Sequence, residues 1–143
     1  MGLSLKKCEI VTNVDQLRVD LQETFMKYTT IKQWAYIIHD RDDTRPHYHI
    51  LLSFDRASVD LEQIAKWFDV PPQFVSKIKT KWARALEYLT HSGPGDEHKY
   101  QYPESDVKAN FAFEREIKKA KILGDFEHYS YQIRSWKSSF MEL

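Results

Sequence analysis

The sequence has little cysteine, no excess of either charge and no long apolar run. Its single cysteine, Cys8, excludes an internal disulfide and fits a reducing cytoplasm. The 21 basic residues equal the 21 acidic residues, which argues against a protein that binds nucleic acid through bulk positive charge alone. No apolar stretch approaches the ~18 residues needed to span a bilayer, and the N-terminus lacks the apolar run of a secretory signal.

What the chain does contain is typical of one ordered domain. It has 143 residues, of which 42% are hydrophobic and 14% aromatic, enough to bury a sizeable core. Its charge is neutral overall but unevenly spread. The segment Ser76–Arg84 carries four cations and no acid, so a local basic surface is compatible with the neutral total.

The order of strands and helices predicts the fold class. Apolar runs predict strands over Lys6–Thr12, Gln33–His39, Pro46–Phe54 and Phe74–Lys79. Apolar residues at three- and four-residue steps predict helices over Val14–Tyr28 with Asn13 as N-cap, after a Ser58 cap up to Pro71-Pro72, and over Lys81–His91, 111–123 and 129–140. The order β-α-β-β-α-β predicts an α+β, ferredoxin-like antiparallel sheet, as in RNA-recognition modules, with extra C-terminal helices.

Histidines gather around the second and third strands. His47 and His49 occupy positions i and i+2 of one strand, so both imidazoles lie on the same side of it. His39 ends the preceding strand, and the short polar turn makes an antiparallel hairpin that brings the three close together. Asp42 or Asp43 in the turn can add an oxygen. This sulfur-free set suits Mn²⁺, Mg²⁺, Co²⁺ or Zn²⁺, with Mn²⁺ or Mg²⁺ favoured in the cell. The other histidines, His91, His98 and His128, show no such grouping and are predicted to be surface residues or caps.

A candidate nucleophile lies on the Lys81–His91 helix. Tyr88 falls on a face beside the apolar stripe, together with Lys81 and Arg84. Nearby positive charge favours a phenolate, and the same cations could hold a phosphodiester. Spacing alone nevertheless favours a tyrosine that packs at the edge of the core, as most of the eight tyrosines must.

Three segments together resemble a known family. His39-Asp40-Arg41-Asp42, then His47-Tyr48-His49 with its apolar continuation, then Tyr88-Leu89-Thr90-His91 resemble the HUH endonucleases. The match is closest to the replication-initiator (Rep) family of small Gram-positive rolling-circle plasmids, which uses a single catalytic tyrosine. The similarity covers about residues 5–110. The HxH pair is weak on its own, but the three segments in this order and spacing are specific.

The resemblance implies roles for these residues. It makes His47 and His49 metal ligands, His39 and Asp42 the remaining ligands, and Tyr88 the nucleophile. It implies a five-stranded antiparallel sheet and metal-dependent nicking of single-stranded DNA at a hairpin in a replication origin. The tyrosine would become linked to the 5′-phosphate and leave a free 3′-OH, and the reverse step would rejoin the strands. The residues expected to hold DNA phosphates are Lys77, Lys79, Lys81, Arg84 and Arg45.

The implied partners are single-stranded or hairpin origin DNA, a host helicase and polymerase, and further copies of the chain if it oligomerises; no membrane is expected. Residues 1–124 are expected to form the origin-binding and nicking domain. Residues 125–143 are expected to form a C-terminal helical extension, at which an oligomerisation segment could begin.

Two alternatives stay open. A relaxase, transposase or small-virus initiator of the HUH class would use the same chemistry, but relaxases tend to carry a third histidine beside the pair and an early nucleophile, where only Tyr28 stands. A non-catalytic module of the RNA-recognition type would stack bases on Tyr36 and Tyr48. Histidines, however, stand where its glycine-rich aromatic signature should be.

Overall fold

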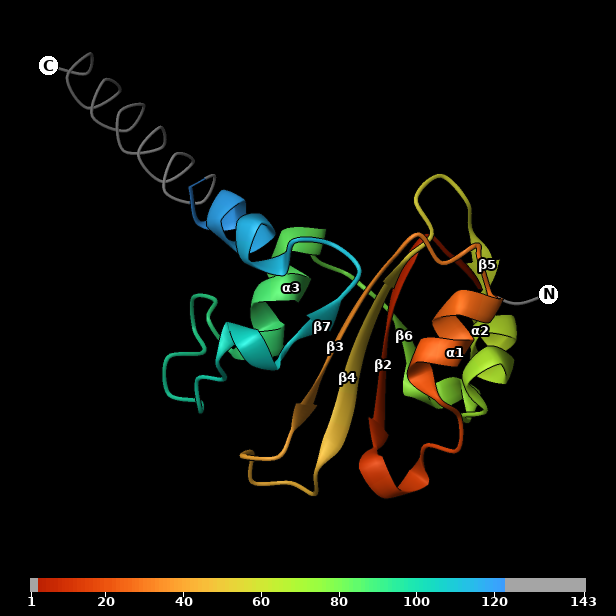
Figure 1. Ribbon diagram of the computed structural model, residues 1–143, viewed down its shortest axis with the longest axis horizontal. Helices are drawn as coiled ribbons and strands as arrows, with labels where there is room; N and C mark the ends of the chain where they lie inside the picture. Colours follow the sequence, from red (N-terminus) through yellow and green to blue (C-terminus); the bar gives the residue numbers. More distant parts are fainter. Residues whose placement is uncertain (1–2, 123–143) are drawn as a thin grey trace, which may run out of the picture.

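Five strands form an antiparallel sheet in the order β6-β2-β4-β3-β7 in the computed structural model, which describes residues 3–122 (Figure 1). They are β2 (Lys7–Asn13), β3 (Gln33–His39), β4 (His47–Ser53), β6 (Val75–Lys77) and β7 (Lys108–Ala109). In the first four places of this order the sheet follows the ferredoxin-like arrangement, and the α+β prediction is confirmed. A second, two-stranded sheet pairs β1 (Ser4–Leu5) with β5 (Val59–Asp60).

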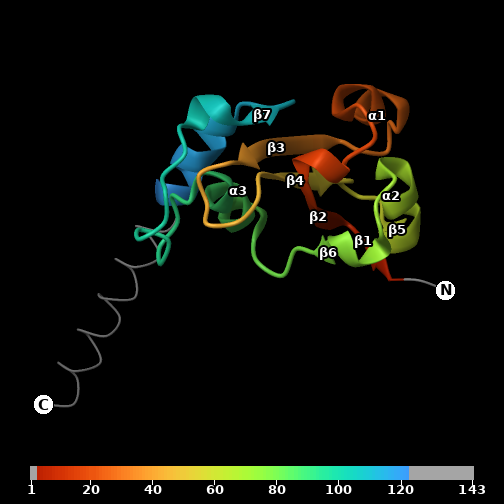
Figure 2. The ribbon, with the colours of Figure 1, turned by 90° about the horizontal axis from the view of Figure 1, so that it is seen from below.

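Helices cover both faces of the five-stranded sheet. Helices α1 (Leu21–Lys27) and α2 (Leu61–Phe68) lie on one side, and α3 (Trp82–Thr90) lies on the other (Figure 2). A further helix begins at residue 113 and reaches residue 122, where the described residues end. We call the two sides the α1/α2 face and the α3 face.

Strand β4 shows how the sequence supplies both faces. It lies in the middle of the sheet, paired with β2 and β3 along its whole length. Because strand side chains alternate, Ile50 and Leu52 join the core of the α1/α2 face, with Cys8 fully buried beside them. Leu51 joins a second core on the α3 face, together with Leu86 and other residues of that layer. His47 and His49 share the side of Leu51, so the histidine pair points toward α3.

Two predicted helix starts are wrong. The chain does not enter a helix at Val14: residues Val14–Gln16 make one 3₁₀ turn, and α1 begins at Leu21. Asp20 is the cap in place of Asn13, because its carboxylate accepts the Glu23 backbone N–H at 2.9 Å. The second helix begins at Leu61 after Asp60, because pairing with β1 keeps Val59–Asp60 extended.

The remaining segments follow the prediction where they are described. Residues 99–110 form a loop that contains the 3₁₀ turn Glu104–Asp106 and ends in the short edge strand β7. The predicted helix 111–123 begins two residues later, and the helix 129–140 and the extension 125–143 lie outside the described residues. Within residues 3–122, no helix is long and apolar enough to cross a membrane.

Candidate functional site

Three histidines meet at one end of the α3 face. His39 lies directly opposite His47 in the β3–β4 ladder, and their ring centroids are 5.3 Å apart. The ring of His49, two residues further along β4, lies 5.6 Å from that of His39. His39 and His49 are buried, with 1% and 4% of their surface exposed. The proximity that the hairpin predicted is therefore present.

Hydrogen bonds to backbone carbonyls orient two of these imidazoles. His39 Nε2 donates to the carbonyl oxygen of Leu89 at 2.8 Å, which leaves Nδ1 unprotonated and 3.5 Å from Asp42 Oδ2. His47 Nδ1 donates to the carbonyl oxygen of Arg45 at 3.0 Å, which leaves Nε2 facing the same carboxylate at 3.9 Å. One nitrogen of each imidazole thus faces the Asp42 carboxylate, and hydrogen bonds of this kind orient the ligands in metal sites.

Asp42 is held by a residue that the sequence did not indicate. Tyr102 donates its hydroxyl hydrogen to Asp42 Oδ1 at 2.9 Å and accepts the Arg41 backbone N–H at 2.8 Å. Its ring stacks on His39, with centroids 4.7 Å apart. Burial is the main cause that raises the pKa of Tyr102 to about 12, so the hydroxyl remains a donor at neutral pH. Asp43, the other acid considered, is exposed.

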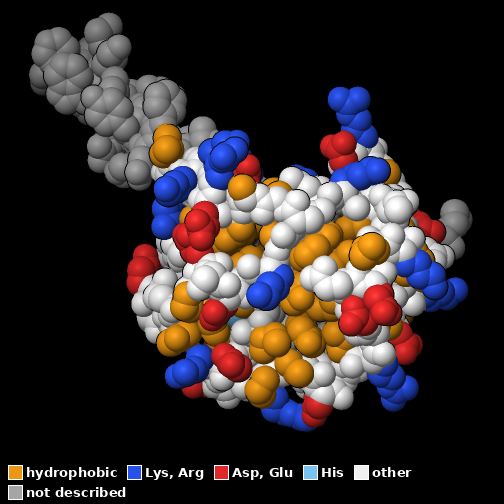
Figure 3. Space-filling view, viewed as in Figure 1, with side chains coloured by type: hydrophobic (Ala, Val, Ile, Leu, Met, Phe, Trp, Pro, Cys, Tyr) orange, Lys and Arg blue, Asp and Glu red, His pale blue; other side chains and the backbone are white. Residues whose placement is uncertain are grey.

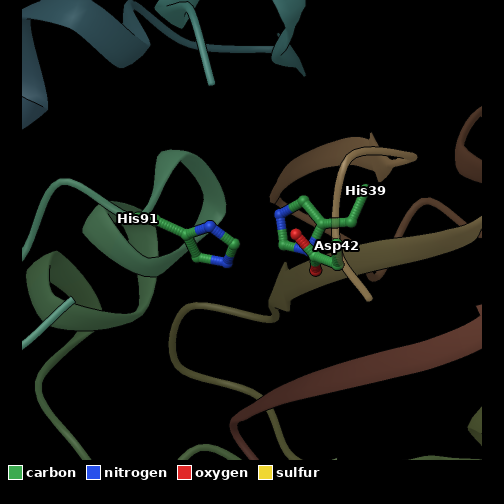
Figure 4. A group of neighbouring side chains, drawn as sticks. All are labelled: His39, Asp42 and His91. Atoms are coloured by element: carbon green, nitrogen blue, oxygen red, sulfur yellow. The ribbon is translucent and has the colours of Figure 1, made fainter. Parts of the chain in front are cut away.

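The prediction for His91 is half wrong. It is a cap, with a left-handed φ of 58° at the end of α3, but only 2% of its surface is exposed. Its ring lies 4.7 Å from that of His39, and its Nδ1 donates to the Tyr100 carbonyl at 2.8 Å. His39, Asp42 and His91 each offer a ligand atom, and these atoms lie within 4.8 Å of one another (Figure 4). The sequence held one indication that His91 belongs to the site: it follows Tyr88 by three residues, which places both on the same helix face.

Tyr88 stands on α3 at the edge of this cluster, with 38% of its surface exposed. Its ring centroid lies 5.3 Å from that of His49 and 5.2 Å from that of His91. The cation that touches it is Lys99, whose Nζ donates to the hydroxyl oxygen at 3.4 Å and lies 4.7 Å from the ring centroid. Lys99 comes from the loop after α3, whereas the sequence pointed to cations within the helix.

A hollow of about 710 Å³, the first hollow, opens beside Tyr88 toward β6 and the start of α3. Lys77, Lys79 and Arg84, three of the five cations expected to hold phosphates, line it together with the three clustered histidines. Lys81 instead occupies the N-cap position of α3, outside this lining. Arg45 pairs with Asp15 away from the hollow. The structure therefore gathers part of the expected basic set at the histidines.

Burial favours the neutral imidazole of His39. Burial is the largest cause that lowers the pKa of His39 from 6.5 to about 4, so the ring is uncharged at neutral pH and free to bind a cation. His49 Nε2 lies 3.0 Å from Glu9 Oε2, an acid of β2 that the sequence did not single out. The alternation of β2, which buries Cys8 and Ile10 on the other face, would have placed Glu9 on this side.

Tyr36 and Tyr48, the tyrosines of the binding-module alternative, lie on the opposite face of the sheet. Their ring centroids are 6.1 Å apart, and both pack against the core that α1 and α2 cover. Figure 3 shows hydrophobic side chains gathered over β3 and β4 on this visible side of the molecule. The two tyrosines are thus separated from Tyr88 by the thickness of the sheet.

Comparison with known proteins identifies the family. The model of the plasmid replication protein, origin-binding domain, matches residues 6–116. The chain is also 35% identical over 133 residues to a protein named "Replication protein" from Onion yellows phytoplasma (strain OY-M), which covers 80% of this chain and 34% of that protein. It thus spans about one third of the length of that relative. The chain belongs to the family of plasmid replication protein origin-binding domains.

Proposed function

We propose that this domain initiates rolling-circle replication by nicking single-stranded origin DNA, with Tyr88 as nucleophile, and that it rejoins strands by the reverse step. The observation that carries the proposal is the position of the Tyr88 hydroxyl. It lies 3.4 Å from a lysine nitrogen, and its ring packs beside His49 and His91. A phenol between a cation and a group of oriented imidazoles is suited to attack on a phosphodiester.

The donor set fits a divalent metal. His39 Nδ1 and His47 Nε2 are the nitrogens that do not bond to backbone carbonyls, and both face Asp42. We propose His39, Asp42, His47 and His49 as the ligands, with Mn²⁺ or Mg²⁺ as the cellular metal and Co²⁺ or Zn²⁺ as substitutes in vitro. When bound, the metal would polarise the scissile phosphate and stabilise the charge that develops on it.

The chain's own residues supply the remaining steps. Tyr88 Oη attacks the phosphorus, the bond to the 3′ oxygen breaks, and the phenol proton is released while the departing oxygen takes one up. Lys99 Nζ, already in contact with Oη, balances the charge of the phosphate. The product is a phosphotyrosine ester to the 5′ end and a free 3′-OH. Attack by a 3′-OH on that ester reverses the reaction without an outside energy source.

A covalent-adduct assay tests the proposal. The protein is incubated with a randomised single-stranded DNA library and Mn²⁺, and the mixture is separated on a denaturing gel. We expect a slow-migrating protein–DNA band that is lost with EDTA and in Tyr88→Phe. Tyr36→Phe, which removes the same hydroxyl on the opposite face, is the matched control and should react like the unaltered protein.

The outcomes separate the alternatives. An adduct that survives in Tyr88→Phe would show that another residue is the nucleophile. A protein that binds the library with and without EDTA but forms no adduct would favour the non-catalytic binding module. Sequencing of the trapped strands would reveal the target sequence. A target that matches plasmid origins would indicate an initiator, whereas one that matches transfer origins or transposon ends would indicate a relaxase or transposase.

The wider biology follows from the same chemistry. A free 3′-OH is a primer, so we propose that a host polymerase extends it while a host helicase opens the duplex. We also propose that the protein assembles into oligomers on origin DNA.

A further inference from the structure

Tyr88 separates two hollows. On the side away from the first hollow lies a second hollow of about 510 Å³, between the β3–β4 turn and the loop that follows α3. Tyr88 and His47 line both of them. A phosphodiester under attack has a nucleotide on either side, so a strand whose scissile phosphate lies at Tyr88 extends into both hollows. Only the first of them carries the cations that the sequence suggested.

The second hollow holds an exposed aromatic ring in a fixed position. Tyr100 has 44% of its surface exposed, and its ring packs perpendicular to that of buried Tyr102, with centroids 4.8 Å apart. The guanidinium carbon of Arg41 lies 5.6 Å from the centroid of the Tyr100 ring. An exposed ring with a guanidinium over it offers planar groups of the kind on which unpaired bases stack.

The same hollow holds a cation at the reacting atom. Lys99 Nζ lies 3.4 Å from Tyr88 Oη and 3.3 Å from Asp96 Oδ1. Burial by itself would lower the pKa of Lys99, but the hydrogen bonds to Tyr88 and Asp96 outweigh burial and raise it, so the side chain keeps its charge. The Lys99 cation and the Tyr100 ring thus line the same hollow, where they can contact the phosphate and the base of one nucleotide.

We propose that the second hollow is a nucleotide subsite, in which the base next to the scissile phosphate stacks against Tyr100 and Arg41 while Lys99 contacts the backbone. The inference rests on the proposed nicking function and names where one flank of the strand binds. The occupant is single-stranded DNA, because a base paired within a duplex does not offer its face to a side chain. Two acids, Asp42 and Asp43, line this hollow. Asp42 accepts the hydroxyl hydrogen of Tyr102, so Asp43 is the acid of the rim that the contacts described above do not engage.

Two probes separate stacking from charge. Binding is measured by fluorescence anisotropy in EDTA and low salt, with a labelled twelve-nucleotide oligothymidylate and with an abasic strand of the same length. Tyr100→Ala should weaken oligothymidylate binding about 5- to 150-fold, which is the usual loss for one stacked base, and leave abasic-strand binding unchanged. Lys99→Met should weaken both probes by the same factor and reduce the salt dependence by about one counterion.

Matched variants control for the fold. Tyr100→Phe keeps the ring and should bind like the unaltered protein. Tyr48→Ala removes a ring from the opposite face and should leave both affinities unchanged. Equal affinities of Tyr100→Ala and the unaltered protein for oligothymidylate would overturn the subsite, as would an equal loss on both probes. A loss confined to Tyr48→Ala would move the strand to the other face of the sheet.

Because these binding measurements contain no metal and no cleavage step, they are independent of the nicking assay. An unaltered protein that forms no adduct would defeat the proposed function while the subsite result stands by itself as a binding site. An active protein whose Tyr100→Ala variant binds both probes normally would defeat only the subsite.

Discussion

The two faces of the five-stranded sheet are built from the same strands but carry different contents. The α1/α2 face buries large rings. Phe25 stacks on Trp34 with ring centroids 4.3 Å apart, and the Phe68 ring centroid lies 6.0 Å from that of Phe25. The α3 face buries His39, His49 and His91 beside a smaller apolar core. The difference indicates that most of the free energy of folding is gained on one face, which allows the other to bury polar rings at a cost.

The largest loss of stability is expected when a ring is removed from the α1/α2 face. Phe68 is fully buried, and Phe68→Ala should lower the free energy of unfolding by about 3–5 kcal/mol, because it removes apolar contacts and leaves a cavity. Urea denaturation measures this. The exposed Met26→Ala is the control and should change stability by less than about 0.5 kcal/mol. Adduct formation per folded molecule should be unaffected, and a parallel loss of both would show that the faces are coupled.

On the α3 face, pH should have the next largest effect. His39 has a pKa of about 4 when folded and an ordinary value of 6.5, so the unfolded chain binds the extra proton between these values. Stability of the metal-free protein should therefore fall as pH drops from about 6.5 to 4, by up to about 3 kcal/mol from this group.

Urea denaturation in EDTA at several pH values isolates that contribution when His39→Asn is compared with the unaltered protein. The variant should lose the steep part of the pH dependence, whereas the exposed His98→Asn should retain it. Identical pH profiles for His39→Asn and the unaltered protein would mean that burial of His39 carries no such cost.

A smaller effect is expected where the α3 face orients its proposed metal ligands. Tyr102→Phe keeps the stack on His39 but removes the hydroxyl that donates to Asp42. Loss of such an orienting hydrogen bond should weaken Mn²⁺ binding about 10- to 100-fold, measured by isothermal titration calorimetry. Tyr100→Phe removes a hydroxyl from the neighbouring ring and should bind Mn²⁺ normally. Unchanged affinity in Tyr102→Phe would show that Asp42 needs no such support.

The smallest effect tests whether damage confined to the α1/α2 face stays there. Asp20→Ala removes the cap of α1 and should cost about 1 kcal/mol of stability with no change in Mn²⁺ affinity. Asp15→Ala, which breaks an exposed ion pair with Arg45, should cost less. Thermal denaturation measures the stability of each variant, and calorimetry on the same samples measures its Mn²⁺ affinity. A change of metal affinity in Asp20→Ala would contradict the independence of the faces.

How much the sequence predicted depends on the distance between contacting residues. The period-two pattern of β4 and the short turn before it sufficed to place His39, His47 and His49 together. The start of α1 was missed because a side-chain cap at Asp20 competed with an earlier apolar spacing. Local patterns thus locate elements well and their first residues less well.

The contacts that complete the site join segments with no pattern in common. Tyr102 meets Asp42 across 60 residues, and Lys99 meets Tyr88 from a loop whose path no periodicity describes. His91 was predicted to be an ungrouped surface residue or cap because its partners come from another strand and turn. Such groupings depend on tertiary packing, which spacing along one element cannot show.

The double pairing of β4 also constrains how the chain can vary in length. The insertion or deletion of one residue between His47 and His49 would shift every following side chain to the other side of the sheet. Leu51 and Ile50 would exchange layers, and a histidine would enter the ring-filled core. Changes of length in this domain should therefore accumulate in loops outside the sheet rather than within β4.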